Sequence, residues 1–172
     1  MRFTLTLMIL FSLVSCSRKS DTELYTDAKA AEAIKDFQKA VELYEQVVDR
    51  FPTVATAESS LVRLSVIYNN DIKDPRKAID TYRRCYNMFP SSKQAPTMLF
   101  LTGFVFNNEL HMLDSARIVY ETFLQKYPDN DLAASAKFEL ETLGKDPGMS
   151  ITQGEMVVDN SKSDKPKKAV KK

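Results

Sequence analysis

The sequence has no tryptophan, four glycines and a single histidine in 172 residues. Together these shortages argue against a glycine-rich catalytic loop and against a turn-rich all-β fold. His111 has no second imidazole with which to share a metal ion. It stands 38 residues after Lys73, which is one step of an internal repeat in which both positions fall in the turn between paired helices. We therefore expect His111 to be a surface residue in a turn. We predict no metal site, no cofactor and no small-molecule substrate.

Cysteine is also scarce, and Cys16 and Cys85 are the only two. Once Cys16 is lipidated, as argued below, no intramolecular disulfide can form. No histidine lies within 25 residues of Cys85, so the spacing does not support a Cys–His nucleophile. Its helical surroundings predict a small core residue. Because no other catalytic constellation is found, we expect that the chain is not an enzyme.

The charge is unevenly distributed, although the formal net charge is only +1. Residues 162–172 hold six lysines and one aspartate, a net +5, whereas residues 16–161 carry a net −5. An acidic body with a basic tail is poorly suited to phosphate backbones, so we predict no nucleic-acid partner. Gly144, Pro147 and Gly148 break the last helix, and we predict a disordered Lys-rich tail over 144–172.

The first fifteen residues have the parts of a secretory signal. Arg2 precedes an apolar run from Phe3 to Val14, which is shorter than the roughly 20 residues of a spanning helix. The small residue Ser15 then stands before Cys16. We predict a signal peptide over 1–15 and a linker, which begins with the lipidated cysteine, over 16–20.

Leu13-Val14-Ser15-Cys16 resembles the lipobox of bacterial lipoproteins, in which the cysteine is acylated and becomes the first mature residue. The resemblance implies a lipid anchor at Cys16. Several acyl chains attach a protein stably, because each buried methylene contributes roughly 0.8 kcal/mol. Ser17 is compatible with sorting to the outer membrane, so we expect anchoring there, on the periplasmic face. The alternative is an ordinary signal peptide with a chance cysteine.

An internal repeat with a step of 38 organises the chain between residues 21 and 143. Five columns recur in three copies: Ala40/Ala78/Ala116, Tyr44/Tyr82/Tyr120, Phe51/Phe89/Tyr127, Pro52/Pro90/Pro128 and Ala57/Ala95/Ala133. Apolar spacings of three and four predict helices, and each aromatic-Pro pair ends one, because the residue before proline avoids the helical region. We predict helices over 21–33, 36–50, 54–69, 74–88, 92–108, 112–126 and 129–143.

Several helix starts carry capping residues. Asp74 offers an N-cap, and Pro75 follows at the first helical position. Ser91-Ser92 and the run from Asp129 to Asp131 are predicted to begin the helices over 92–108 and 129–143. The last helix has no partner and is expected to cover the open end of the stack.

The repeat resembles the tetratricopeptide repeat (TPR) family. Its second helix matches in all three copies, and its first helix matches at Leu61, Leu64 and Tyr68 and at Leu99, Gly103 and Phe106. Ser65 replaces the usual glycine and Thr102 the usual leucine. The first copy departs further from the family pattern, because Thr26, Asp27 and Ala30 occupy the corresponding positions. We therefore expect the first helix of this copy to pack less tightly. The resemblance implies an all-α, right-handed antiparallel helix-hairpin solenoid of about three TPR units plus a capping helix.

The step of 38, longer than the usual 34, resembles the TPR lipoproteins of outer-membrane protein assembly (YfiO/BamD-like) and the TPR domain of the Tol-Pal coordinator (YbgF-like). This implies a membrane-anchored envelope scaffold or adaptor that binds partner proteins, with a role in outer-membrane protein assembly. The alternative is a cell-wall or glycan-associated lipoprotein with Tol-Pal-like coordination. The lack of tryptophan counts against this alternative, because sugar-binding sites often use exposed aromatic rings.

In TPR stacks the first helices line a concave groove that holds a partner segment. Mapping the family's groove positions onto this chain gives Val62, Val66, Asn69 and Asn70, and one step later Phe100, Phe104, Asn107 and Asn108. The amides could satisfy the backbone of an extended peptide. Alternatively, the apolar residues are core, and the asparagines close each first helix in the left-handed conformation. We single out Phe104 as the best candidate for a groove contact.

Overall fold

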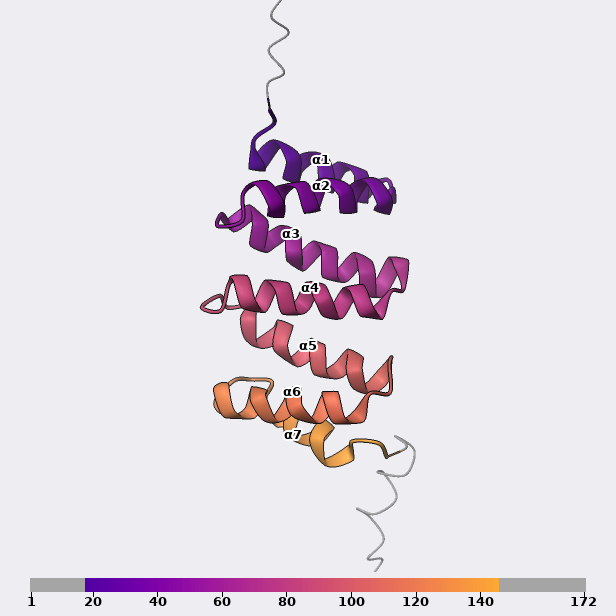
Figure 1. The fold of residues 1–172 in the computed structure, drawn as a ribbon, viewed down its shortest axis with the longest axis vertical. Helices are drawn as coiled ribbons and strands as arrows, with labels where there is room; N and C mark the ends of the chain where they lie inside the picture. Colours follow the sequence, from indigo (N-terminus) through magenta and orange to yellow (C-terminus); the bar gives the residue numbers. More distant parts are fainter. Residues whose placement is uncertain (1–17, 146–172) are drawn as a thin grey trace, which may run out of the picture. The chain divides into compact units, whose positions relative to one another are not determined.

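A computed structural model describes residues 18–145, and this part of the chain is all-α, without a strand. Figure 1 shows the helices in chain order. They are α1 (Asp21–Ala33), α2 (Phe37–Arg50), α3 (Ala55–Val66), η1 (Ile67–Ile72, a π-helical turn), α4 (Pro75–Met88), α5 (Ala95–Asn108), α6 (Leu113–Lys126) and α7 (Ala133–Thr142). The described residues divide into two compact units, 18–92 (unit 1) and 93–145 (unit 2).

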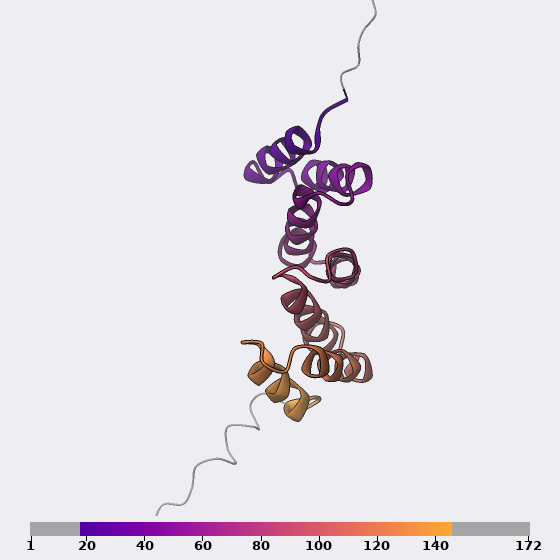
Figure 2. The same ribbon diagram turned by 90° about the vertical axis from the view of Figure 1, so that its left-hand side faces the viewer.

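In unit 1, each helix packs against the next one along the chain, from α1 through to α4. We call α1, α3, α5 and α7 the A helices and α2, α4 and α6 the B helices. Figure 2 shows the two A helices of this unit on one side and its two B helices on the other. The same sequence of contacts holds in unit 2, where α6 packs against both α5 and α7. Each unit is a TPR-like stack of helix hairpins, which confirms the predicted all-α fold.

The aromatic-Pro pairs end all three B helices in the same way. Phe51, Phe89 and Tyr127 have φ between −135° and −126° and ψ between 54° and 58°. In each case the aromatic residue's N–H still donates to the carbonyl four residues earlier. The proline that follows cannot donate the next helical hydrogen bond. The predicted helix ends are therefore confirmed in every copy.

The predicted helix starts are confirmed at one place and wrong at two. Asp74 caps α4 by accepting from the Lys77 N–H at 3.1 Å, with Pro75 at the first position. However, α5 begins at Ala95 and α7 at Ala133, rather than at 92 and 129. The residues after each aromatic-Pro pair form hydrogen-bonded turns first, as in Ser92 N–H to Phe89 O at 3.0 Å.

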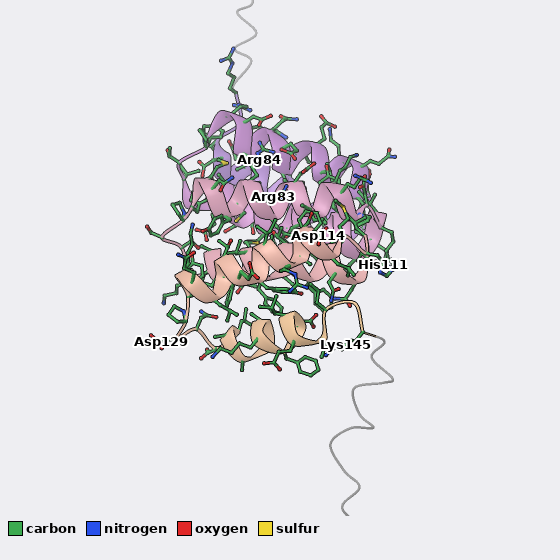
Figure 3. The ribbon with its side chains drawn as sticks, turned by 60° about the horizontal axis from the view of Figure 1, so that its bottom comes forward. Arg83, Arg84, His111, Asp114, Asp129 and Lys145 are labelled. Carbon is green, nitrogen blue, oxygen red and sulfur yellow. The ribbon has the colours of Figure 1, made fainter. Side chains whose placement is uncertain are left out.

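The turn within each hairpin contains a residue in the left-handed region. These residues are Lys35, Lys73 and His111, with φ of 62°, 61° and 52°, and no other non-glycine residue of 18–145 has positive φ. His111 lies exposed beside the start of α6 (Figure 3), which confirms the predicted surface turn. The alternative role for the asparagines, closing the first helices in a left-handed conformation, is wrong. The left-handed residue comes three positions after the second asparagine of each pair.

Replacing Lys35 with Gly is expected to stabilise unit 1 by about 0.5–1 kcal/mol. A residue with a β-carbon is strained in the left-handed region, and glycine is not. The matched control is Lys29→Gly, another exposed lysine but inside α1, which should cost about 1 kcal/mol. Urea denaturation would measure both changes. A loss of stability in Lys35→Gly as large as that in Lys29→Gly would contradict the turn geometry.

The π-helical turn η1 marks a change of register between the first two copies. The Asp36 N–H donates to the carbonyl of Ala31, five residues back, at 2.9 Å. In the next hairpins, the corresponding bonds run six residues back, from Asp74 to Tyr68 and from Met112 to Phe106, both at 2.8 Å. Ala31 is therefore the counterpart of Tyr68, one residue out of step with the 38-residue repeat of the B helices.

This register change explains the apparent departure of the first copy. Leu24, Ala28 and Ala31 are the buried residues of α1. They correspond to the buried Leu61 and Ser65 of α3 and the buried Tyr68 of η1. Thr26 and Ala30, in contrast, are exposed. The expectation of looser packing is wrong, because α1 and α2 form the most extensive helix–helix contact of the described chain.

The repeat columns form the core of each unit. The alanine and tyrosine columns are buried throughout, from Ala40 and Tyr44 at 0% exposure to Tyr82 at 4%. Cys85 is also buried as a free thiol, which confirms its predicted core role. Burial raises its pKa to about 11, and Glu58 adds to the shift, so the thiolate is disfavoured.

Gly103 permits the closest approach of α5 to α6. A β-carbon there would lie 2.8 Å from Cε1 of the buried Tyr120 ring. This is the physical basis of the glycine that the TPR resemblance places at Gly103. In α7, the exposed Lys137 and Glu141 stand one step after the buried Leu99 and Gly103. No further helix follows α7 within residues 18–145, and these charges suit a solvent-facing end.

Candidate partner-binding faces on the A helices

The predicted groove residues lie on A helices of both units. In unit 1, Val62 and Val66 are on α3 and are half-buried, and Asn69 and Asn70 are in η1. Asn69 is half-buried and Asn70 is exposed. The Asn69 amide donates to the Asn70 side-chain oxygen at 2.8 Å. We call these four residues the unit 1 face.

The counterparts in unit 2 are Phe100, Phe104, Asn107 and Asn108 on α5, which we call the unit 2 face. Phe104 is 38% exposed, a large value for an aromatic side chain on a packed helix. Its ring is stacked against that of Phe100, with centroids 6.5 Å apart and planes 28° apart. The Phe100 ring in turn lies 5.8 Å from Tyr120 and 6.0 Å from Phe123, both fully buried. The exposed ring is thus supported by core aromatic residues.

The two asparagines of the unit 2 face differ from those of unit 1 in their hydrogen bonds. Asn107 donates to the Glu139 carboxylate of α7 at 3.1 Å. Asn108 donates to the carbonyl of Phe104, one turn earlier, at 3.1 Å. Both amides are therefore occupied within unit 2, whereas the Asn69 and Asn70 side chains bond to each other. The unit 1 pair therefore keeps three N–H donors for a partner, whereas the unit 2 pair keeps two.

A charged cluster that sequence reasoning missed lies beside the unit 1 face. The Tyr44 hydroxyl of α2 donates to the Glu32 carboxylate of α1 at 2.8 Å. Arg63 of α3 pairs with the same carboxylate, and its Nε donates at 3.1 Å. Burial raises the pKa of Tyr44 to about 12, and Tyr25 adds to the shift, so the hydroxyl remains a donor at neutral pH. The cluster links two neighbouring A helices through a B-helix tyrosine.

The same arrangement recurs in unit 2 with different residue types. The Tyr120 hydroxyl donates to Glu139 of α7 at 3.4 Å, and Asn107 of α5 donates to the same carboxylate. In unit 1 the carboxylate lies on the A helix before the tyrosine, and in unit 2 it lies on the A helix after the tyrosine. The signal in the sequence is the separation of the paired positions, Glu32 from Arg63 and Asn107 from Glu139. The two separations differ by one residue because the hydrogen bond that closes the α1–α2 turn spans five residues, whereas the bond that closes the α5–α6 turn spans six.

Phe138 on α7 is a second exposed aromatic residue of unit 2, at 59% exposure. It stands one repeat step after Phe100, which packs on Tyr120 of the following B helix. No following B helix exists for α7 within the described residues, so this ring is left uncovered there. The sequence analysis predicted only a capping role for α7 and did not name Phe138, although the 38-residue step from Phe100 leads to this residue.

The described residues hold no group of three or more metal-ligating side chains. Nor does any helix in residues 18–145 have the length and apolarity needed to cross a bilayer. Cys16, the predicted lipidation site, lies outside the described residues, as does the predicted tail beyond residue 145.

Hairpins of A and B helices define the described part of the chain as a helical-repeat fold. The family described as YfiO, outer membrane lipoprotein, matches residues 17–146, and the chain belongs to this family. A comparison with curated proteins found no match.

Membership of the family confirms four expectations. The chain is an outer-membrane lipoprotein with a helical-repeat fold, and the family implies a lipid anchor. As a member of a lipoprotein scaffold family it is not an enzyme.

Proposed function

We propose that this lipoprotein is a scaffold that holds another cell-envelope protein on its A helices and takes part in outer-membrane protein assembly. The unit 1 and unit 2 faces would each contact the partner. Family membership supports this role over the alternative of a cell-wall or glycan-associated lipoprotein. We further propose that Cys16 carries the lipid, which keeps the partner close to the membrane.

The observation that carries the proposal is the exposed Phe104 ring held by Phe100. An aromatic side chain that is already ordered loses little conformational entropy when a partner covers it. Aromatic anchors of this kind dominate the energetics of many interfaces. The amides of Asn69 and Asn70 add polar contacts of the type that an extended chain needs.

Phe104→Ala is expected to weaken partner binding at least tenfold, because loss of a central aromatic anchor typically costs about 2 kcal/mol or more. A photoreactive phenylalanine analogue at position 104 would first identify the partner by crosslinking in cells. Binding of the purified partner to the wild-type and variant chains would then be measured, together with the levels of outer-membrane proteins in cells that carry the variant.

The matched control is Ile118→Ala, which removes an apolar side chain of 63% exposure from α6, a B helix of the same unit. This variant should bind the partner as the wild type does. Equal weakening by both substitutions, or by neither, would contradict the assignment of the unit 2 face. Circular dichroism melts would verify that both variants remain folded.

A further inference from the structure

A basic hollow lies where the described chain begins, at the start of α1. It has a volume of about 460 Å³ and is lined by Arg18, Lys19, Ser20, Arg50 and Phe51. We call it the anchor-side hollow. Its lining comes from two places in unit 1, the residues that lead into α1 and the end of α2.

The Arg50 side chain is held in place at this hollow. Its Nη2 donates to the backbone carbonyl of Lys19 at 2.8 Å, and its guanidinium carbon lies 5.1 Å from the centre of the Phe51 ring. A guanidinium has five N–H donors, so this bond uses only a small part of its capacity. The arrangement fixes a cation beside the hollow and leaves donors for a ligand.

Three carboxylates of α1 are engaged with groups other than Arg18 and Arg50. Glu23 accepts from the Ser20 backbone and hydroxyl at 2.8 and 2.9 Å, and Asp27 pairs with Lys19 at 2.5 Å. Asp21 accepts from the Thr56 hydroxyl at 2.6 Å. None of these three carboxylates forms an ion pair with Arg18 or Arg50, and only Asp27 pairs with a cation, Lys19.

Arg18 and Arg50 differ in this respect from Arg63 and Arg84 of the same unit, which are paired with carboxylates. Arg63 pairs with Glu32, and Arg84 on α4 (Figure 3) pairs with Glu45 and Asp49 of α2. No carboxylate within residues 18–145 lies within 4.0 Å of the guanidinium of Arg18 or Arg50. Two guanidiniums without a carboxylate partner beside one hollow have the charge and the hydrogen-bond donors that a phosphate group requires.

The position of the hollow along the chain indicates the source of that phosphate. Arg18 follows Cys16 by two residues, so their Cα atoms are at most about 7 Å apart. Acyl chains on Cys16 would enter the bilayer at the depth of the headgroups and hold Arg18 there. We propose that the anchor-side hollow binds the phosphate headgroup of an anionic phospholipid in the leaflet that holds the anchor. This inference rests on the proposed lipidation of Cys16, but not on the proposed partner face.

The test uses the lipidated full-length mature chain in vesicles of phosphatidylcholine alone or of phosphatidylcholine with phosphatidylglycerol. Phenylglyoxal modification of each arginine would be followed by mass spectrometry. We expect Arg18 and Arg50 to react about fivefold more slowly in the vesicles with phosphatidylglycerol, the factor expected for a basic residue at an anionic surface. The internal control is Arg76 on α4, which is exposed and outside any ion pair in the described residues.

Three results would overturn the proposal. One is equal reactivity of Arg18 and Arg50 in both kinds of vesicle. Another is equal protection of Arg76, which would reflect a general effect of surface charge. The third is the same protection by inorganic phosphate in neutral detergent, which would assign the hollow to free phosphate. The Phe104→Ala chain should show the wild-type protection, so failure of the partner face leaves this result unchanged.

Discussion

Cys16→Ser is expected to abolish acylation of the chain and to remove it from the outer-membrane fraction. The thioether that carries lipid requires the cysteine sulfur, and serine has none. Each acyl methylene buried in the bilayer contributes roughly 0.8 kcal/mol, so losing several chains changes attachment from lasting to negligible. Metabolic labelling with radioactive palmitate and density-gradient separation of the membranes would measure the two effects.

The other cysteine supplies the control for this experiment. Cys85 is buried in α4, and Cys85→Ala should keep both the palmitate label and the outer-membrane location. Palmitate incorporation into the Cys16→Ser chain would show that the anchor lies elsewhere. The proposals that place the chain at the membrane surface through Cys16 would then fail.

Tyr120→Ala is expected to destabilise the protein by about 3–5 kcal/mol, the range for removing a buried aromatic side chain. The ring has 0% exposure, fills the space above Gly103 and lies 5.8 Å from the Phe100 ring. Its loss leaves a cavity between α5 and α6 that a helix hairpin cannot close without moving its backbone. Chemical denaturation of the purified chain would measure the change in the free energy of unfolding.

Tyr120→Phe separates packing from hydrogen bonding at this position. It keeps the ring and removes only the hydroxyl that donates to Glu139 at 3.4 Å, so we expect a loss of about 1 kcal/mol or less. If Tyr120→Ala lost less than about 1 kcal/mol, the repeat alignment that places this tyrosine in the core would be wrong. Similar losses in the two variants would instead attribute the stability to the hydroxyl.

Much of the fold could be read from local sequence because its determinants are local. A proline disfavours the helical conformation of the residue before it, and the three aromatic-Pro pairs ended three helices as predicted. The starts of α5 and α7 could not be placed in the same way. Ser92 and Asn130 are residues that suit both an N-cap and a turn, and in both cases the turn formed.

The roles of the asparagines depended on contacts between helices. Asn107 and Asn69 stand one repeat step apart and look alike in the sequence, but only Asn107 meets a carboxylate on the next A helix of its unit. The exposure of Phe104 also could not be predicted from the sequence. The pattern identified its helix face, whereas its exposure depends on how Phe100 packs against the core.

The sequence by itself determined the all-α repeat, the B-helix ends, the core tyrosines and the lipobox-like motif at Cys16. These features depend on backbone sterics and on short-range apolar spacing, which act within a single helix or turn. Only the tertiary structure decided the one-residue shift at η1, the Glu32 and Glu139 clusters and the basic hollow around Arg50. The two clusters and the hollow join residues that lie about 30 positions apart, because the packing of one hairpin on the next sets which polar groups meet.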